Sequence, residues 1–416
     1  MRIAMLTNNY KPFVGGVPIS IDRLSQGLRN LGHEVYIFAP SYENQDEEAY
    51  VIRYRSKQKK LRGEFVVPNI LDRSIEEKFA SISFDVIHVH HPMLIGYTAQ
   101  YLSKKYNVPI VYTYHTRYEK YLHYLQPYNL LQKQIMENDS RNHFLFKSKK
   151  ALYNGSEKII TLHNRKFTNH CSLVLAPTNS MKEYLEENGT ITSIEVIPTG
   201  LTDEDFTYDK EMVYELRRKY LGDKKYLFCS VSRLEKEKNI NFILEGLVRF
   251  KERKDDCFSL LLIGDGGCKE EFRTKAKSLG LEDNVIFTGC IEHSLIRNYC
   301  CACDLFVFAS QSETQGIVLL EAMAAGLPVV AVKATGVNDV ISDGWNGYVT
   351  EPDVDEWENS LEIIIENTTQ RDWMKQNALI EARQYLSFNI ARRVEKLYEN
   401  LVYYQRMEHI CENKIV

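Results

Sequence analysis

Two glutamates stand eight residues apart in the segment SETQGIVLLEAM (residues 312–323). Glu313 and Glu321 enclose Gly316 and a short apolar run. Such a pair could serve as a general acid and base, could accept hydrogen bonds from sugar hydroxyls, or could be the solvated end of a helix. The acids of a glycosidase must flank a scissile bond, and two acids on one loop and the helix that follows it are badly placed for that.

The glycine between the two acids predicts a chain break followed by a helix that starts near Ile317. Glu313 would then lie in the loop and Glu321 in the helix. The first backbone N–H groups of a helix have no partner within it and attract anions. We therefore expect this helix start to meet an anion such as a phosphate, with contributions from Gln315, Gly316, Ile317, Val318 and Leu319.

Two cations follow another expected strand, residues 226–231, in the segment SRLEKEKN (residues 232–239). Arg233 and Lys238 would lie at the carboxyl end of that strand. Two cations there could neutralise a diphosphate leaving group, a task that a metal ion performs in other enzymes. The alternative is an ordinary solvated run of Lys and Glu.

Glycines also follow several expected strands, where they would let backbone N–H groups approach a phosphate. The first pair does not form a GxGxxG motif, so a tight turn explains it equally well. The glycines in question are Gly15 and Gly16 after the first strand, then Gly264 and Gly266, and Gly289, after two later strands.

His115 closes an expected strand in TYHTRYEKYLHY (residues 113–124). A histidine at a strand end can bond a sugar hydroxyl or assist a departing phosphate, although a structural histidine is the common alternative. His88, His90 and His91 cluster at the end of a neighbouring strand. No nearby carboxylate has the spacing of a metal ligand, so we expect no metal site.

These residues are placed by a strand–helix alternation that occurs twice along the chain. Such alternation predicts an α/β protein with two Rossmann-like, doubly wound domains. We expect an N-terminal domain over residues 1–200, a C-terminal domain over residues 201–386 and a long amphipathic helix over residues 387–416. Ligands of such sheets bind beyond the carboxyl ends of the strands, which here predicts a central cleft between the domains.

The bulk composition is that of a soluble globular protein, with 416 residues, 44% hydrophobic and 26% charged. No apolar run is long enough to span a bilayer, and the start shows no signal peptide. Nine cysteines are scattered along the chain, and Cys300, Cys301 and Cys303 form a cluster in a helix-like apolar context, where packing is favoured over zinc binding. This usage fits a reduced cytoplasm.

Charge is distributed unevenly. Residues 1–200 hold 25 Lys+Arg and 19 Asp+Glu, which gives +6, and the remainder holds 52 − 25 = 27 against 56 − 19 = 37, which gives −10. Residues 53–62 hold six Lys/Arg and no acid, and residues 141–170 are basic with interleaved apolar side chains. This composition predicts contact with an anionic membrane surface, although an ordinary packed helix is the alternative. The expected membrane contacts are Arg141, Phe144, Lys147, Lys149, Lys150, Arg165 and Lys166.

Nucleic acid is not expected as a partner, because the net charge is negative and no base-stacking motif is present.

Together these motifs resemble the family 4 retaining glycosyltransferases over nearly the whole chain. The likeness rests on Gly15-Gly16-Val17, Gly32-His33-Glu34-Val35, Arg233 with Lys238, and Glu313 with Glu321 ahead of AMAAGLPVV (residues 322–330). It implies the GT-B fold, in which the first domain binds mainly the acceptor and the second binds a nucleotide sugar. The C-terminal helix of such proteins typically crosses back onto the first domain.

The resemblance also implies roles for single residues. Arg233 and Lys238 would hold the donor diphosphate, Glu313 the hydroxyls of the donor sugar, and Glu321 the ribose. His115 would touch the donor sugar, and Gly16 would meet the phosphates or the acceptor. The usual proposal for such enzymes is a same-face attack without a protein nucleophile and without a required cofactor.

One departure from the family pattern narrows the prediction. Many members have Gly-Phe-Gly after the first glutamate, whereas this chain has Thr314-Gln315-Gly316. That variant, with TYHTRYEKYLHY and HHPMLIGYTA (residues 90–99), is similar to the bacterial diacylglycerol glucosyltransferases, which are peripheral membrane enzymes that use UDP-glucose.

We therefore expect a hexose, with glucose favoured, to move from a UDP-sugar to diacylglycerol or a related lipid at the cytoplasmic face of the plasma membrane. One alternative is the same catalyst acting on a cell-wall, capsule or soluble acceptor. Another is a sugar-nucleotide-binding protein without turnover, against which the intact set of Arg233, Lys238, Glu313 and Glu321 argues.

Overall fold

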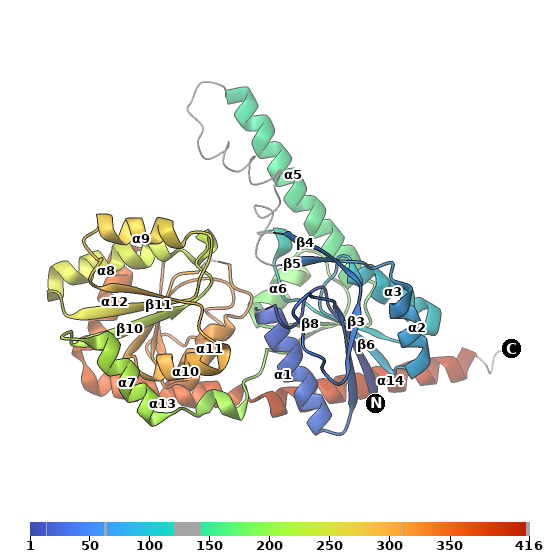
Figure 1. The fold of residues 1–416 in the computed structure, drawn as a ribbon. Coiled ribbons are helices and arrows are strands. Elements are labelled where there is room, and N and C mark those ends of the chain that lie inside the picture. The colour runs from blue at the N-terminus through green and yellow to red at the C-terminus, as the bar shows by residue number, and fades with distance from the viewer. Residues whose placement is uncertain (14, 62–64, 120–142, 311, 413–416) are drawn as a thin grey trace. The chain divides into compact units, whose positions relative to one another are not determined.

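The computed structural model of the chain describes residues 1–13, 15–61, 65–119, 143–310 and 312–412 (Figure 1). It divides into two compact units. The first contains Met1–Pro198 together with Phe388–Val416, and the second contains Thr199–Ser387. Each unit is built on one parallel β-sheet with helices packed against it. The α/β fold predicted from the alternation of strands and helices is confirmed.

The sheet of the first unit has seven strands in the order β3-β2-β1-β6-β7-β8-β9. The chain starts in the middle of this sheet, moves to one edge, and then returns to the other side of β1. The order therefore reverses between β1 and β6, which pair directly. The strands are β1 (Arg2–Leu6), β2 (Glu34–Pro40), β3 (Val51–Tyr54), β6 (Val86–Val89), β7 (Ile110–Thr113), β8 (Leu173–Ala176) and β9 (Ile194–Val196).

Two cores cover the two faces of this sheet, because successive side chains of a strand point to opposite faces. In β1, Ala4 and Leu6 belong to one core, whereas Ile3 and Met5 belong to the other. The first core receives side chains from α2 (Arg73–Ile82), α3 (Ile95–Tyr106), α5 (His143–Thr168) and α6 (Asn179–Glu187). The second core receives side chains from α1 (Gly16–Asn30) and α14 (Ser387–Glu412).

The C-terminal helix α14 is thus an integral part of the first unit. Ile390, Ala391, Val394 and Tyr398 are buried in its core. Polar contacts reinforce this packing, since His33 Nε2 lies 2.8 Å from Glu395 Oε1 and the Tyr398 hydroxyl lies 2.6 Å from His88 Nδ1. Helix α14 therefore reaches the same strand, β6, that leads into the histidine cluster.

The sheet of the second unit has six strands in the order β12-β11-β10-β13-β14-β15. Here the order reverses between β10 and β13. The strands are β10 (Tyr226–Val231), β11 (Phe258–Ile263), β12 (Val285–Gly289), β13 (Leu305–Phe308), β14 (Val329–Val332) and β15 (Gly347–Thr350). The helices are α7 (Lys210–Leu221), α8 (Ile240–Lys254), α9 (Lys269–Ser278), α10 (His293–Cys301), α11 (Ile317–Ala324), α12 (Val354–Glu366) and α13 (Thr368–Gln384).

Two cores again enclose this sheet. One packs α8, α9 and α12 against one face, with the buried Trp357 among its side chains. The other packs α7, α10 and α11 against the opposite face. Cys300 and Cys303 are buried in this second core, as expected for cysteines that act as packing residues.

The basic segment that starts at Arg53 lies in strands. It continues from β3 into β4 (Ser56–Leu61), which forms an antiparallel pair with β5 (Phe65–Pro68). Arg53 is withdrawn from the surface, because its side chain is only 13% exposed and its Nη1 donates to the carbonyl of Pro40 at 3.1 Å. Arg53 is therefore engaged within the protein, and the membrane contact expected of the segment stays a prediction.

Candidate active site

The predicted cations and the first glutamate follow the two strands at which the second sheet reverses its order. Arg233 and Lys238 come after β10, and Glu313 comes after β13, its direct neighbour. Carboxyl ends of parallel strands meet at one edge of a sheet, and the reversal leaves a crevice there because the adjoining helices pack on opposite faces. The fold thus gathers these three residues where such a sheet binds ligands.

Lys238 and Glu313 form an ion pair at this position. The Nζ of Lys238, at the end of the short 3₁₀ turn Lys236–Lys238, donates to Oε1 of Glu313 at 2.5 Å. Both side chains are about as buried as each other, with 14% and 15% of their surface exposed. Partly buried charges interact more strongly than charges in water, so the ammonium and the carboxylate neutralise each other in the absence of ligand.

The carboxyl group of Glu313 stays ionised in this environment. Burial raises its pKa, but the nearby charge and hydrogen bond of Lys238, with smaller contributions from Ser310 and Arg233, lower it by more. The net pKa lies below the ordinary value for glutamate. Glu313 is therefore an acceptor of hydrogen bonds rather than an acid catalyst at neutral pH.

Arg233 is held on the loop between β10 and α8. Its Nη2 donates to Oε1 of Glu237 at 3.1 Å, while nearly half of its side chain remains exposed. Glu237 in turn accepts a hydrogen bond at its backbone carbonyl from the hydroxyl of Ser310, at 3.3 Å. The loop after β10 and the loop after β13 are thus joined, which fixes Arg233 relative to Glu313.

Gly264 and Gly266 have a packing role that the sequence did not indicate. The loop after β11 lies directly against the loop that carries Arg233, with the N–H of Leu234 donating to the carbonyl of Asp265 at 2.9 Å. A Cβ atom at Gly264 would lie 2.0 Å from the carbonyl oxygen of Ser232, and one at Gly266 would lie 2.5 Å from that of Leu234. Gly264 has φ of +136°, and its N–H donates to the carbonyl of Gly289 at 3.0 Å. These glycines therefore position the arginine loop.

A Gly264→Ala substitution should destabilise the second unit far more than a matched substitution elsewhere. We expect a loss of roughly 3 kcal/mol, because the new methyl group meets backbone and the backbone conformation is strained. Gly280→Ala is the control, since Gly280 also has positive φ but nothing lies within 4 Å of its added Cβ. We expect that change to cost about 1–2 kcal/mol. Urea unfolding of both variants measures the difference, and equal losses would contradict the packing role.

Helix α11 begins at Ile317, as the glycine predicted, but the N–H group of Leu319 is already used within the helix start. Gly316 is the N-cap and has φ of +72° and ψ of 54°, a left-handed conformation that favours glycine. The N–H of Leu319 donates to the carbonyl of Gly316 at 2.8 Å. Leu319 is also fully buried, so the first-turn N–H groups that suit an anion are those of Ile317 and Val318.

The side chain of Gln315 is used within the protein. It is 4% exposed, its Oε1 accepts from the N–H of Thr199 at 2.7 Å, and its Nε2 donates to the carbonyl of the same residue at 3.0 Å. This two-bond contact ties the loop between the acids to the first residue of the second unit. A donor contact by Gln315 would therefore have to come from its backbone.

Glu321 has a partner that sequence analysis missed. Its Oε1 lies 3.1 Å from Nε2 of His293, the first residue of α10. His293 comes shortly after Gly289, at the carboxyl end of β12, so the rule that placed Arg233 and Glu313 also pointed to it. It adds an imidazole to the side of the site at which Glu321 lies.

The first unit brings its histidines together where its own sheet reverses. His115 lies two residues after β7, and its Nε2 is 2.9 Å from Nδ1 of His90, which follows β6. The two rings stack with centroids 5.2 Å apart. Burial lowers the pKa of His115 to about 3, so its imidazole is neutral at physiological pH. Gly15 and Gly16 lie at the start of α1, which follows the neighbouring strand β1.

The other two histidines of this cluster are engaged within the protein. His88 lies between the Thr113 and Tyr398 hydroxyls, at 2.6 Å from each. His91 Nδ1 accepts from the N–H of Asn8 at 3.2 Å. Across the residues that the structure describes, no group of three or more His, Cys, Asp or Glu is arranged to hold a metal ion.

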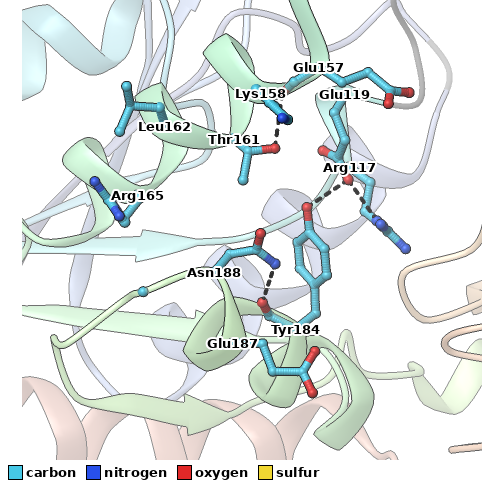
Figure 2. A pocket seen from close by; sticks show the side chains of 11 residues that line it. Arg117, Glu119, Glu157, Lys158, Thr161, Leu162, Arg165, Tyr184, Glu187 and Asn188 are labelled. Atoms are coloured by element: carbon cyan, nitrogen blue, oxygen red, sulfur yellow. Dashed lines mark hydrogen bonds and ion pairs between the residues drawn. The ribbon is translucent and has the colours of Figure 1, made fainter. Parts of the chain in front are cut away.

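A cavity of about 670 Å³ lies beside the segment that follows His115 (Figure 2). Glu119 is 4% exposed, and its Oε1 accepts from Nε of Arg117 and from the Tyr184 hydroxyl, each at 2.8 Å. The guanidinium of Arg117 also lies over the ring of Tyr184, 4.2 Å from its centroid. This network anchors the segment after His115 to α6. Arg165, predicted to meet a membrane, lines the same cavity.

Helix α5 is buried on one side and exposed on the other over residues 155–168, the part whose side chains the structure describes. Phe167 and Thr168 pack inside the first unit, whereas Ile159 and Leu162 are 68% and 42% exposed. Among the predicted membrane contacts, Arg165 and Lys166 are exposed, Arg141 lies outside the described residues, and so do the side chains of Phe144, Lys147, Lys149 and Lys150. The ring of Tyr97 on α3, itself half exposed, lies 5.6 Å from that of His163. We call Tyr97, Ile159, Leu162, Arg165 and Lys166 the α3–α5 surface.

Comparison with known families agrees with this arrangement in both units. The family model described as "Glycosyltransferase Family 4" matches residues 14–205, and the model described as "Glycosyl transferases group 1" matches residues 214–380. The chain is a family 4 glycosyltransferase. This confirms the resemblance seen in the sequence, and it makes the protein an enzyme that transfers hexose. The interpretation as a binding protein without turnover is therefore not retained.

Two full-length relatives carry the same name. The alpha-monoglucosyldiacylglycerol synthase of Acholeplasma laidlawii is 27% identical over 97% of this glycosyltransferase and 98% of its own length. The alpha-monoglucosyldiacylglycerol synthase of Streptococcus pneumoniae is 29% identical over 96% of this chain and 85% of its own.

Solved structures show the same fold. The HepE protein of Anabaena, crystallised with UDP, matches with a TM-score of 0.70 and 21% identity over 96% of this chain and 100% of its own. Sucrose-phosphate synthase from Thermosynechococcus elongatus matches with a TM-score of 0.73 and 19% identity, over 97% of this chain and 99% of its own. The fold of this glycosyltransferase is thus GT-B, with two Rossmann-like domains.

Proposed function

We propose that this glycosyltransferase moves a glucosyl unit from UDP-glucose to diacylglycerol or a related membrane lipid, with retention of the anomeric configuration. The observation that carries the proposal is the similarity, over 96–97% of the chain, to two proteins named for monoglucosyldiacylglycerol synthesis. The arrangement of the second unit supports a nucleotide-sugar donor, since it offers cations, helix N–H groups and carboxylates at one strand edge.

In this proposal Arg233 and Lys238 bind the diphosphate of the donor, together with the first N–H groups of α11. Glu313 accepts hydrogen bonds from hydroxyls of the donor sugar, and Glu321 from those of the ribose. Lys238 must divide its contacts between Glu313 and the incoming phosphate. Because the phosphate adds negative charge, the cation is better neutralised in the complex than in the free enzyme.

The chemical step needs a stabilised leaving group more than it needs a base. The bond between the anomeric carbon and the phosphate oxygen breaks, a bond to the acceptor oxygen forms on the same face, and the departing phosphate takes the acceptor proton. Negative charge grows on the phosphate in the transition state, where fixed cations stabilise it strongly. We propose that Arg233 and Lys238 supply this stabilisation, so that no cofactor is required.

The α3–α5 surface supports a membrane partner at the inner face of the plasma membrane. It combines exposed apolar side chains with two exposed cations, a composition that suits the interface of an anionic bilayer. None of the helices that the structure describes is long and apolar enough to cross a membrane. Binding by a surface of this kind would bring the enzyme to an acceptor that stays in the bilayer.

Charge and apolar contact at this surface can be separated in a vesicle sedimentation assay. We expect the enzyme to sediment with anionic vesicles and less with neutral ones. An Arg165→Glu/Lys166→Glu variant should bind roughly 30-fold more weakly or worse, because each of the two lost cations contributes about 1 kcal/mol near anionic lipid. Ile159→Ser/Leu162→Ser should also weaken binding. Ile363→Ser, at an exposed position on α12 of the second unit, is the control and should bind normally. Equal loss in all variants, or no retention by either vesicle, would remove the support for a membrane acceptor.

The proposed reaction itself is tested by a screen of donors against diacylglycerol in mixed micelles, with detection of the product by mass. We expect a hexosyl-diacylglycerol to form with UDP-glucose. Product from another UDP-hexose alone would correct the donor. Transfer only to soluble saccharides or cell-wall fragments would overturn the lipid acceptor and favour a glycosyltransferase with a cell-wall, capsule or soluble acceptor.

A further inference from the structure

We propose that His90 is a positioning residue that fixes the tautomer of His115, so that His115 carries its proton on Nδ1 and acts only as a hydrogen-bond donor. The inference concerns the first unit alone. It rests on the proposed function only for what His115 contacts, and the tautomer itself can be measured without substrate.

One proton lies between the two rings. His90 Nδ1 and His115 Nε2 are 2.9 Å apart, so one nitrogen donates and the other accepts. The rings are nearly parallel, with an angle of 24° between their planes. The strands β6 and β7 that lead to them pair directly, with Val89 opposite Tyr112. Two neighbouring strands therefore hold the rings in this register.

Both imidazoles are neutral. Burial is the largest cause that lowers the pKa of His115 to about 3, and burial together with the neighbouring histidines holds the pKa of His90 well below its ordinary value. A neutral imidazole has one N–H and one acceptor nitrogen. Assigning the shared proton to one ring therefore fixes the tautomer of both.

The far nitrogen of His90 decides the assignment. His90 is 1% exposed, and its Nε2 is buried without a hydrogen-bond partner among the residues that the structure describes. A buried N–H without an acceptor is rarer in proteins than a buried acceptor without a donor. The proton of His90 is then on Nδ1, directed at His115. Consequently Nε2 of His115 is the acceptor, and the proton of His115 is on Nδ1.

This assignment limits what His115 can do in the reaction. Its only acceptor nitrogen is already bonded to His90, so it cannot take the proton of the acceptor hydroxyl as a general base. Its Nδ1–H suits an oxygen of the donor sugar or of the departing phosphate. The result agrees with a reaction in which the leaving phosphate receives the proton.

Neighbouring contacts hold His90 but do not set its proton. The ring of His88 packs on that of His90 with centroids 4.3 Å apart, and His88 is itself held by Tyr398 and Thr113. A Tyr398→Phe variant removes one of these contacts without touching His90 or His115. It is therefore the matched control for any loss of packing in the cluster.

The test is side-chain NMR of the full-length enzyme labelled with ¹⁵N-histidine, because protonated and unprotonated ring nitrogens resonate far apart. The His115 signals are assigned by their loss in His115→Asn. We expect Nδ1 of His115 to be protonated in the wild type and in Tyr398→Phe. A proton on Nε2 in the wild type would overturn the proposal, whatever the activity.

Two substitutions then test whether His90 is the cause. His90→Leu removes the donor, and we expect His115 to populate the other tautomer and kcat to fall about 3- to 10-fold, as for the loss of one hydrogen bond. His90→Asn places an amide N–H near the position of Nδ1 and should restore the wild-type tautomer of His115 and the wild-type kcat. An unchanged His115 tautomer in His90→Leu would show that His90 does not set it. Failure to glucosylate diacylglycerol would overturn the proposed function and leave the tautomer result standing.

Discussion

Replacing Arg233 by alanine is expected to lower kcat about 10²-fold or more, equivalent to roughly 3 kcal/mol of transition-state stabilisation. The guanidinium is nearly half exposed at the carboxyl end of β10, held by Glu237, and carries a charge that a departing diphosphate requires. Because charge develops mainly in the transition state, kcat should fall more than the KM for the donor rises. Release of UDP from UDP-glucose, followed with and without lipid acceptor, measures the effect.

A matched arginine in the same unit gives the control. Arg218 lies on α7, is 68% exposed and pairs with Glu215 one turn away. Arg218→Ala should change kcat by less than about twofold, because exposed ion pairs contribute little. Arg233→Lys keeps the charge but loses the planar fork, so it should recover only part of the rate. Wild-type turnover in Arg233→Ala would remove Arg233 from the site.

The central strands were predictable because they are buried on both faces. Strands β6, β7, β8 and β10 begin and end where the apolar runs of the sequence do. In a parallel sheet such strands appear as short continuous apolar segments. Their order could then be inferred in outline, since strand–helix alternation allows few topologies.

The edges of the sheets carried a weaker signal. β9 has only three residues, Ile194–Val196, and β15 begins with Gly347, so neither has a continuous apolar run. The pair β4–β5 was missed because β4 has the sequence SKQKKL, whose charge suggested a surface for lipids. Pairing along the edge of a sheet depends on the neighbouring strand more than on the strand's own residues.

Local position in the site was predictable, whereas partners were not. The strand-end rule located Arg233, Lys238 and Glu313 without any contact information. The pairing of Lys238 with Glu313 joins residues 75 positions apart. The contacts of Gln315 with Thr199 and of Glu321 with His293 likewise arise from folding. These contacts decide whether a site residue is charged and whether its side chain is available to a ligand. Neither property can be predicted from residue type and spacing alone.

The Lys238–Glu313 pair makes Glu313→Gln the second large effect that we expect. Glutamine keeps the shape but loses the charge that binds donor hydroxyls, and hydrogen bonds to charged groups are worth about 1.5–3 kcal/mol. We therefore expect kcat/KM to fall roughly 10- to 100-fold. The same UDP-release assay measures it. Glu351→Gln is the control, because Glu351 pairs with Lys333 on the exposed surface of the same unit.

The same substitution should change how stability depends on pH. The folded-state pKa of Glu313 lies below its unfolded value, so its contribution to stability is complete above the unfolded pKa, about 4.3. It is lost as pH falls through the lower folded pKa, where the carboxylate becomes protonated. Wild type should exceed Glu313→Gln in urea midpoint at neutral pH, and the gap should narrow below about pH 4.5.

A double-mutant cycle attributes this effect to the pair. Lys238→Met alone leaves Glu313 partly buried without its main attractive partner, so burial should raise the pKa of Glu313 above its ordinary value. The loss of stability that Glu313 contributes at acid pH in the wild type should then disappear, because protonation of a buried, unpaired carboxylate stabilises the folded state. Adding Glu313→Gln to Lys238→Met should then cost less than it does in wild type, by roughly 1–3 kcal/mol of coupling. Additive losses would mean that the two charges do not interact. In that case Lys238 would not pass from Glu313 to the phosphate of the donor when the donor binds. The positions of the Lys238 and Glu313 side chains in the free enzyme would then have to be fixed by other contacts.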